Sequence, residues 1–452
     1  DRVQRMWQRD KNFTCIVTWS TGNESGFGEN LKAAYRWLKA NDDVRQVQYE
    51  AAKDEQYSDI YCPMYKSITV MENYVKTWRN RPLIQCEYAH MMGNSGGNLK
   101  DDWDLIYKHP QLQGGFIWDF SDQTFAIKDK KGNKIWGYGR DMGTVGLTSD
   151  TSFCADGLLS ADRSFHPQAY ELQKVYQNVG FELKDAAGYR IKLINRFDFT
   201  DLSKYQLYWQ IKGDGKVVGN GKQEAFSLGP QEQKEMNLSV PAFERRPGVE
   251  YFIELQFKTR MADALLPAGF VIAREQFALP VQGLGVRANP EKLPALKMVS
   301  TAEKLSFSGK DFTLAFDRKR GLLNSYQLMG RELLQQALEP DFWRPATDND
   351  IGNSLQIRSK VWQNAFQEAE LKSFSHSKDK AGNYTVKTEH RLPGVDAFCI
   401  LSYLIKGNGD VTVNYQLKTG AGKHPEPQRI GMRMVLKGNC EQASWLGRGP
   451  FD

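Results

Sequence analysis

The stretch Leu83-Ile84-Gln85-Cys86-Glu87-Tyr88-Ala89-His90 decides the fold, because an apolar run ends on a carboxylate just before a Gly-rich turn at 93–97. A second stretch, Trp19-Ser20-Thr21-Gly22-Asn23-Glu24-Ser25-Gly26, repeats this plan. Each predicts a buried strand that carries a glutamate to its carboxyl end. Because parallel strands of different βα units meet at one rim, we expect Glu24 and Glu87 to face each other.

The first 178 residues alternate between strand and helix patterns. The periodicity predicts strands at 13–19, 44–49, 59–65, 83–88 and 112–120, and helices at 3–9, 31–38, 68–78 and 98–107. This order implies a parallel sheet. A closed (β/α)8 barrel needs eight strands, whereas five are visible, so we expect a partial TIM barrel whose earlier strands precede Asp1. The chain is therefore expected to be a piece of a longer protein.

From residue 179 the apolar residues recur at every second position. The alternating runs 190–194, 207–211 and 251–257 predict an immunoglobulin-like β-sandwich over 179–281. Gln282-Gly283-Leu284-Gly285 is typical of a linker. A second all-β region, 289–452, contains the alternating runs 312–316 and 411–417 and is expected to be a larger β-sandwich, truncated at its end.

Composition excludes several classes of function. The net charge of +6 is small for 452 residues and its basic residues are scattered, so the chain lacks the basic footprint of a nucleic-acid-binding protein. No apolar run reaches the roughly 18 residues of a membrane span. Aromatic residues make up 12%, which suits stacking on sugar rings and suits β-sandwiches equally well. The cysteines show no metal spacing, and we expect Cys15, Cys62 and Cys86 to be buried free thiols.

The two glutamates have the residue type that glycosidic bond cleavage requires. Two carboxyl groups about 5 Å apart cleave such a bond by double displacement: one attacks the anomeric carbon, and the other exchanges the proton. Each glutamate also has a plainer interpretation. Glu24 could cap the next helix, and Glu87 could be a buried acid paired with an arginine.

A set of longer motifs resembles the bacterial β-galactosidases of glycoside hydrolase family 2. The resemblance rests on 9–12, 19–26, 86–94, 113–119, 154–158, 162–163, 166–167, 342–345, 348–352 and 445–450, and so spans the whole chain. It implies a retaining exo-β-galactosidase (EC 3.2.1.23) that hydrolyses terminal non-reducing β-D-galactose through a covalent glycosyl-enzyme. Because half a barrel has open sheet edges and an incomplete pocket, we expect little or no activity from the 452 residues alone.

The resemblance also implies individual roles. Glu24 would be the acid/base and Glu87 the nucleophile. The substrate-binding residues would be Asn23, Tyr65, His90, Trp118 and Asp156, with Tyr65 donating to Glu87 and Trp118 forming a stacking floor. From the residues alone, Tyr65 is equally a strand-end aromatic, His90 a structural histidine and Trp118 a core residue.

The resemblance implies two metal ions and no organic cofactor. Mg²⁺ would bind beside the acid/base with Glu24 as one ligand, its other ligands lying before Asp1. Na⁺ would bind near the sugar through the Phe153 carbonyl and the position of Asp156. Here Asp156 stands where the family usually has Asn, which adds negative charge beside the ion and the primary hydroxyl of the sugar.

Other interpretations remain open. Relatives with the same two glutamates cleave β-glucuronides or β-mannosides, although the Cys-Glu-Tyr-Ala-His frame favours galactose. A non-catalytic carbohydrate-binding or structural fragment is the alternative of a different class. We expect a β-galactoside substrate, no nucleic-acid or membrane partner, and a homo-oligomer in the full-length parent. The cytoplasm and the periplasm both remain open.

Overall fold

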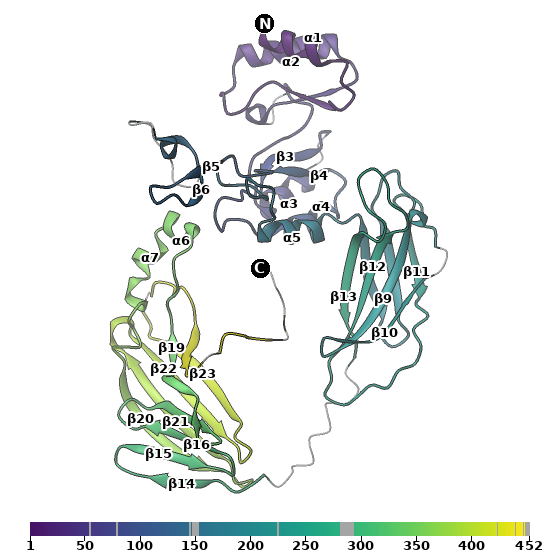
Figure 1. Ribbon diagram of the computed structural model, residues 1–452. Coiled ribbons are helices and arrows are strands. Elements are labelled where there is room, and N and C mark those ends of the chain that lie inside the picture. The colour runs from purple at the N-terminus through teal and green to yellow at the C-terminus, as the bar shows by residue number, and fades with distance from the viewer. Residues whose placement is uncertain are drawn as a thin grey trace.

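The computed structural model describes residues 1–53, 56–77, 80–143, 146, 153–223, 226–280, 293–422, 424–438, 440–445 and 447. The chain forms a mixed α/β region followed by two all-β regions (Figure 1). This order confirms the predicted fold class, a partial (β/α)8 barrel with two β-sandwiches. The predicted boundaries at 178, 281 and 289 stay predictions, and the linker at 282–285 lies outside the described residues.

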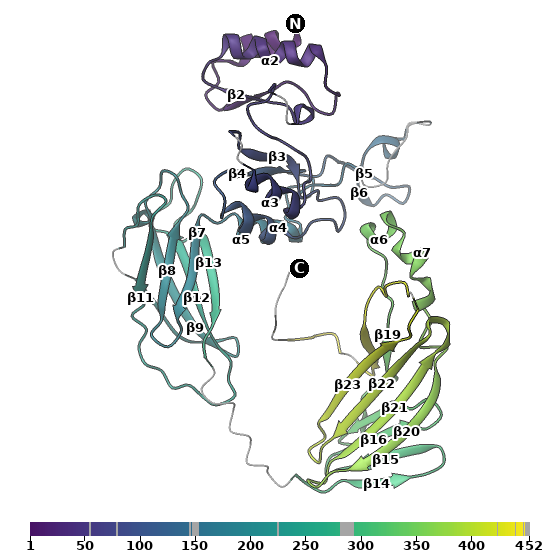
Figure 2. The same ribbon diagram turned by 180° about the vertical axis from the view of Figure 1, so that it is seen from behind.

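The α/β region contains short parallel strands and amphipathic helices. Its helices are α1 Arg2–Asp10, α2 Glu29–Asn41, α3 Ile68–Lys76, α4 Leu99–Ile106 and α5 Pro167–Val175. Its strands are β1 Thr18–Ser20, β2 Gln46–Gln48, β3 Leu83–Tyr88, β4 Leu112–Ile117, β5 Phe125–Lys128 and β6 Lys134–Gly137. Strand β1 pairs with β2 and β3 with β4, both in parallel, while β5 and β6 form a hairpin. Helices α3, α4 and α5 lie together beside β3 and β4 in both views (Figure 2).

Backbone hydrogen bonds join the two parallel pairs through the segment between them. The Asp59 N–H donates to the Val47 carbonyl of β2 at 2.8 Å, and the Ile84 N–H of β3 donates to the Tyr61 carbonyl at 3.0 Å. Isolated parallel bridges link Tyr61 to Leu83 and Met64 to Glu87. The five segments where strands were expected therefore lie side by side in the same order as in the sequence, as the strands of a TIM barrel do.

Three of the five predicted strands keep half of their predicted extent or less. Residues 13–17 form turns instead of a strand, since the N–H of Ile16 bonds back to the carbonyl of Phe13. Apolar character alone misled the prediction there, because Phe13, Val17 and Cys15 are exposed. Residues 59–65 make only the isolated bridges, and β2 keeps three of the six residues predicted at 44–49.

The packing of α3, α4 and β3 shows why these segments fold locally. Met71 and Tyr74 of α3, Leu105 of α4 and Leu83 of β3 form one buried apolar cluster with Ile106 and Leu112. The apolar positions of α3 recur every three to four residues, so one stripe faces the strands. Cys62 is buried as expected and Cys86 is half-buried, whereas the prediction of a buried thiol is wrong for Cys15, which is exposed in the turns before β1.

The described residues of the second region form a sandwich of seven strands. Its strands are β7 Val179–Asp185, β8 Arg190–Asn195, β9 Tyr205–Gly213, β10 Lys216–Lys222, β11 Gln233–Asn237, β12 Tyr251–Thr259 and β13 Val271–Ala278. They form sheets of order β10-β9-β12-β13 and β11-β8-β7. Burial alternates strictly along β12, with Ile253, Leu255 and Phe257 fully inside, which confirms the predicted period-two pattern.

The third region is a larger sandwich with one continuous core. Its strands are β14 Lys297–Ser300, β15 Lys304–Ser308, β16 Phe312–Asp317, β17 Leu322–Leu328, β18 Arg331–Glu332, β19 Leu334–Asp341, β20 Glu370–Lys378, β21 Tyr384–Leu392, β22 Ala397–Ile405, β23 Val411–Thr419 and β24 Gly431–Leu436. A five-stranded sheet, β14 to β18, packs on the four-stranded sheet β20 to β23 through Phe316, Tyr403 and other core residues. Two short helices, α6 Asp348–Gly352 and α7 Leu355–Arg358, interrupt the strands.

Across the described ranges, the search for a helix long and apolar enough to cross a membrane finds none.

Candidate active site

Glu87 lies near the carboxyl end of β3 and is held by Tyr65. The Tyr65 hydroxyl donates to Glu87 Oε2 at 2.6 Å, and the Tyr65 N–H donates to the Glu87 carbonyl at 2.9 Å. Burial, and then the hydrogen bond to the Glu87 carboxylate, raise the pKa of Tyr65 well above its ordinary value. The phenol therefore stays protonated, and it remains a donor to Glu87 across the physiological pH range.

Three residues beside the predicted site adopt left-handed backbone conformations. The φ angles are 47° at Glu24, 49° at Tyr65 and 49° at Ala89. A residue with a Cβ atom pays of order 1 kcal/mol for this region, and such residues gather at functional sites. Glu24, Tyr65 and Ala89 each lie at or just after the end of a strand position. The strained backbone therefore lies where the side chains reach the rim of the sheet.

A second group lies around the buried Asp156 carboxylate. The Trp118 indole N–H donates to Asp156 Oδ2 at 2.9 Å, and His90 Nε2 lies 3.8 Å from the same oxygen. The edge of the His90 ring faces Tyr65, with ring centroids 5.8 Å apart. The structure thus brings together four residues predicted separately, His90, Trp118, Asp156 and Tyr65, and through Tyr65 also Glu87.

Backbone hydrogen bonds hold this group in order. The Trp118 N–H donates to the Tyr88 carbonyl at 3.2 Å, and the Met91 N–H donates to the Trp118 carbonyl at 2.9 Å. The Asp119 N–H then donates to the Asp156 carbonyl at 2.8 Å. Each site residue is therefore fixed by the strand end next to it. The peptide bond between Trp118 and Asp119 is cis.

Asp119 is a neighbour that the sequence interpretation missed. Within the described chain, its Oδ1 atom and Asp156 Oδ1 are both buried without a hydrogen-bond partner. Burial, together with the nearby Asp119 charge, raises the pKa of Asp156. The signal for Asp119 was its place directly after Trp118, but only the fold brings it beside Asp156.

Glu24 and Asn23 lie exposed in the turn after β1. The Glu24 N–H donates to Glu50 Oε1 at 3.0 Å, and the Asn23 carbonyl accepts from the Ser25 hydroxyl at 2.8 Å. In the part of the chain that the structure describes, no hydrogen bond or ion pair joins Glu24 to Glu87. The ladder from β1 through β2 to β3 nevertheless puts both glutamates at the same, carboxyl-terminal edge of the parallel strands.

The residues expected to hold Na⁺ have suitable chemistry. Asp156 supplies a buried carboxylate oxygen with no donor among the described residues, and the side chain of Phe153 is exposed. Hard cations prefer such oxygen ligands. Three or more His, Cys, Asp or Glu side chains grouped for a metal are not found within the described ranges.

The third region also touches the loop that follows Glu87. Asn349 Nδ2 of α6 donates to the Asn94 carbonyl at 3.2 Å. Gly93, at φ +57°, approaches α6 so closely that a Cβ atom there would lie 1.9 Å from Asp348 Oδ2. The motif 348–352 is recognisable in the sequence, but its location beside the site is not, because Asn349 and its partner Asn94 are 255 positions apart.

Comparison with known proteins agrees with this architecture. Residues 1–181 match the TIM barrel domain of the glycosyl hydrolases family 2. Residues 191–280 match β-galactosidase domain 4, and residues 308–452 match the β-galactosidase small chain. The fold has the arrangement of a barrel domain followed by β-sandwich domains, in the same order as the three matched models. In these three stretches the chain is similar to glycosyl hydrolase family 2 and to the β-galactosidases.

Relatives share this order over the whole chain. A β-galactosidase of Priestia megaterium is 33% identical over 456 aligned residues, which cover 100% of this chain and 44% of that protein. A β-galactosidase 2 of Enterobacter cloacae is 33% identical, covering 100% of this chain and 46% of that protein. The chain spans about half the length of these curated relatives.

Solved structures give a weaker similarity. A β-glycosidase from Bacteroides vulgatus matches with a TM-score of 0.32 and 10% identity, covering 92% of this chain and 52% of that one. A β-glucuronidase from Bacteroides uniformis matches with a TM-score of 0.29 and 11% identity, covering 96% of this chain and 54% of that one.

Proposed function

We propose that this chain contributes the catalytic pair of a retaining exo-β-galactosidase, with Glu87 as nucleophile and Glu24 as acid/base. The hydrogen bond of 2.6 Å from the Tyr65 hydroxyl to Glu87 Oε2 carries the proposal. It aims the carboxylate and leaves Oε1 free to react. A charged acceptor makes this bond stronger than a neutral one.

In the first half of the reaction, a Glu87 oxygen forms a bond to the anomeric carbon as the bond to the aglycone oxygen breaks. Glu24 donates its proton to that departing oxygen. The carboxylate charge of Glu87 disappears in the ester, and Glu24 is left charged. Tyr65 stays protonated, so it can keep its hydrogen bond while the ester forms.

In the second half, Glu24 accepts a proton from water, whose oxygen attacks the same carbon from the face that the aglycone left. The bond from the carbon to Glu87 breaks and the carboxylate returns. Each half of the reaction inverts the configuration at the anomeric carbon, so the product retains the configuration of the substrate. The Tyr65 hydroxyl stabilises the departing carboxylate, which is where its donor role has most effect.

The remaining residues supply binding. Trp118 offers an indole face to the apolar face of the sugar, and its N–H is tied to Asp156 at 2.9 Å, which sets the tilt of the ring. His90, beside Tyr65, hydrogen-bonds sugar hydroxyls, as does Asn23 next to Glu24. Asp156 places its negative charge beside the primary hydroxyl of the sugar.

Two cations complete this proposal. Na⁺ would be held by Asp156 and the Phe153 carbonyl, and Mg²⁺ by Glu24 together with ligands from outside this chain. The Na⁺ would supply a positive charge that offsets the buried Asp156 and Asp119 carboxylates and orients the sugar hydroxyls. Homo-oligomerisation is proposed only for the full-length parent.

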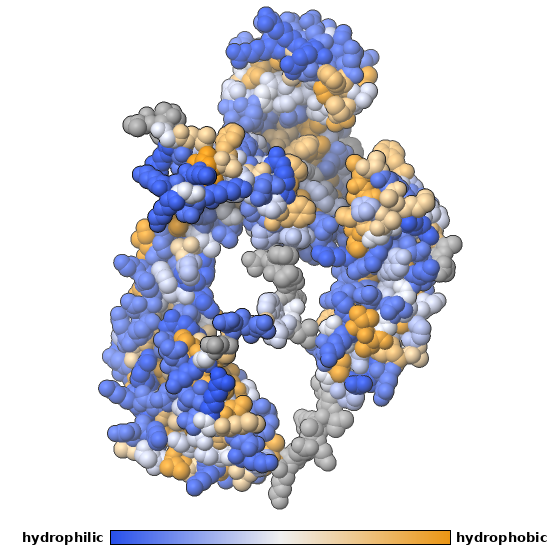
Figure 3. Space-filling view, viewed as in Figure 1, coloured by the Kyte–Doolittle hydropathy of each residue, from blue (hydrophilic) through white to orange (hydrophobic). Residues whose placement is uncertain are grey.

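The 452 residues alone are proposed to have little or no activity. The described parallel strands do not close into a barrel, and four phenylalanines of this region are more than 60% exposed: Phe116, Phe120, Phe125 and Phe165. Apolar patches are visible over this region in the surface view (Figure 3). Because monomers rarely leave such a surface uncovered, we infer that another part of the intact protein covers it. Without that part, the proposed sugar pocket lacks one of its walls.

The test compares chromogenic β-galactoside, β-glucuronide and β-mannoside on the intact protein and on the 452-residue chain. We expect the intact protein to prefer the galactoside and the chain alone to be inactive. Preference for glucuronide or mannoside would replace the substrate assignment. Turnover by the chain alone would contradict its proposed inactivity, and failure of the intact protein on all three would reject the enzymatic proposal.

A further inference from the structure

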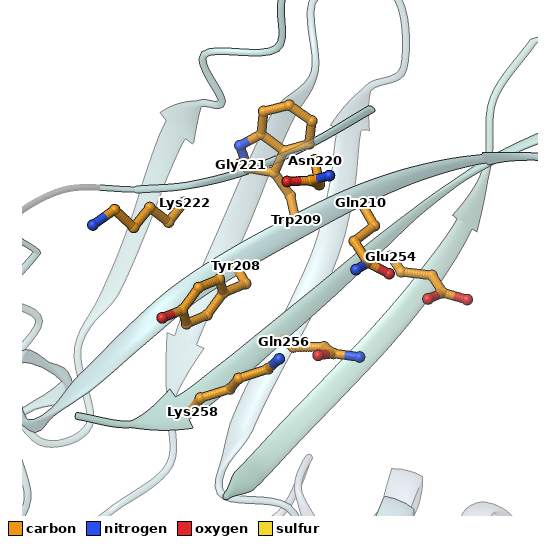
Figure 4. Close-up of a pocket in the computed structure, with 9 residues that line it drawn as sticks. All are labelled: Tyr208, Trp209, Gln210, Asn220, Gly221, Lys222, Glu254, Gln256 and Lys258. Carbon is orange, nitrogen blue, oxygen red and sulfur yellow. The ribbon is translucent and has the colours of Figure 1, made fainter. Parts of the chain in front are cut away.

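The outer face of the sheet β10-β9-β12 forms a polar groove away from the candidate active site. Figure 4 shows the side chains of this groove, which has a volume of about 300 Å³. Its lining residues are Tyr208, Trp209, Gln210, Asn220, Gly221, Lys222, Glu254, Gln256 and Lys258. Trp209 differs from the other lining residues, because its side chain is buried in the core on the other face of the sheet.

Register places the polar side chains next to one another. Gln210 of β9 stands between Asn220 of β10 and Glu254 of β12, and Tyr208 stands opposite Gln256. Directly opposed residues on one face have Cβ atoms about 5 Å apart. The amides of Gln210, Asn220 and Gln256 form no hydrogen bond to any described residue, although Gln210 and Gln256 are half-buried. Three neighbouring amides therefore offer unused donors and acceptors.

The charges of the groove are unevenly compensated. Glu254 is held by Lys212 Nζ at 2.8 Å and by Gln276 Nε2 at 2.8 Å, so its charge is already satisfied. Lys258 Nζ lies 4.8 Å from the centroid of the Tyr208 ring and forms no ion pair with a described carboxylate. An ammonium held by a ring beside three free amides favours an anion that also carries hydroxyl groups.

We propose that this groove binds an acidic oligosaccharide, a short sugar chain bearing carboxylates. One carboxylate lies against Lys258, and the hydroxyls of the flanking sugars bond to the amides of Gln210, Asn220 and Gln256. A neutral sugar would leave the ammonium of Lys258 unmatched. The site belongs to the sandwich and is independent of the proposed hydrolysis.

The test measures binding of tetragalacturonate to the 452-residue chain by isothermal titration. We expect saturable binding that weakens as salt is raised, because a carboxylate–ammonium contact is screened. Lys258→Gln and the double variant Gln210→Ala/Gln256→Ala should each weaken binding by about tenfold. Far-UV circular dichroism reports whether the variants keep the fold.

Lys234→Gln is the matched control, because Lys234 also lies over an aromatic ring, Phe226 at 5.4 Å, but on the opposite sheet. It should bind as the unchanged chain does. Glu87→Gln should bind equally well, which separates this site from the active site. The proposal is overturned if tetragalacturonate does not bind, if neutral galactotetraose binds as tightly, or if Lys258→Gln has no effect.

Discussion

Tyr65 holds Glu87 at two points, through its hydroxyl at 2.6 Å from Oε2 and through its N–H at 2.9 Å from the carbonyl. The left-handed φ of 49° at Tyr65 allows both bonds to form from one residue. Backbone and side chain of the proposed nucleophile are thus positioned by the neighbouring strand position. The reactivity of Glu87 should therefore depend directly on Tyr65.

Tyr65→Phe in the intact enzyme tests this dependence. Loss of one hydrogen bond to a charged group costs about 1.5–3 kcal/mol, which corresponds to a roughly 10- to 100-fold lower kcat. We expect KM to fall as well, because the glycosyl-enzyme breaks down more slowly and accumulates. Pre-steady-state release of the aglycone measures both effects. Tyr189→Phe, in the first sandwich, is the control, and equal kcat in both variants would remove Tyr65 from the mechanism.

The indole of Trp118 should be oriented by Asp156. In Asp156→Asn an amide oxygen can still accept from the indole N–H, whereas in Asp156→Leu nothing can. We expect Asp156→Leu to raise KM for galactoside about 5- to 10-fold more than Asp156→Asn does, from a lost hydrogen bond of about 1 kcal/mol. Steady-state kinetics at fixed Na⁺ measure the difference. Identical KM values in the two variants would show that Asp156 does not act through Trp118.

Asp102 should make stability depend on pH. Burial, and then the charge of Asp101, raise the pKa of Asp102 from its ordinary value of 3.8 to about 6. Because the folded-state pKa lies above the unfolded value, the folded state binds more protons between these pH values. The free energy of unfolding therefore falls as pH rises through this window.

Asp102→Asn removes the free-energy cost of ionising this partly buried carboxyl group in the folded state. A shift of about two units corresponds to ~3 kcal/mol, and the partial exposure of Asp102 reduces the expected gain to about 1 kcal/mol above pH 6, with none below pH 3.8. Amide hydrogen exchange of β3 and α4 between pH 4 and 8 measures it. Asp104→Asn, at an exposed position in α4, is the control. A gain independent of pH would contradict the assignment.

Gly157 should tolerate no side chain. A Cβ atom there would lie 2.2 Å from the Asp122 backbone nitrogen, so the backbone next to Asp156 must shift. We expect Gly157→Ala to cost at least about 2 kcal/mol of stability and to weaken galactoside binding. Gly97→Ala is the control, since its Cβ would meet nothing within 4 Å. Urea unfolding followed by tryptophan fluorescence compares the two, and equal midpoints would contradict the close approach.

Long alternating strands could be predicted from the sequence, whereas short parallel ones could not. Strand β12 shows its period over nine residues, with the apolar residues Ile253, Leu255 and Phe257 at inward positions. Strand β1 keeps three residues, too few for any period, and Phe13 and Val17 before it are exposed. Helix α5 was missed, although Pro167 at its first turn is a start signal.

The candidate site residues were predicted one by one, but most of the contacts between them were not. The hydrogen bond between Tyr65 and Glu87 had been inferred from family resemblance, and the tie between Trp118 and Asp156 had not been foreseen. Neither the Asp119 carboxylate beside Asp156 nor the contact of Asn349 with Asn94 could be foreseen. Such contacts join segments far apart in sequence, and no local pattern encodes them.

The most direct measurement is covalent trapping of the nucleophile. The intact enzyme is treated with a 2-deoxy-2-fluoro-β-galactosyl fluoride, whose slow glycosyl-enzyme hydrolysis lets the ester accumulate, and the labelled peptide is sequenced by mass spectrometry. The account predicts one sugar per chain, attached to Glu87, and no label on that peptide in Glu87→Gln. A label on Glu24 or on another carboxylate, or a product of inverted configuration, would contradict it.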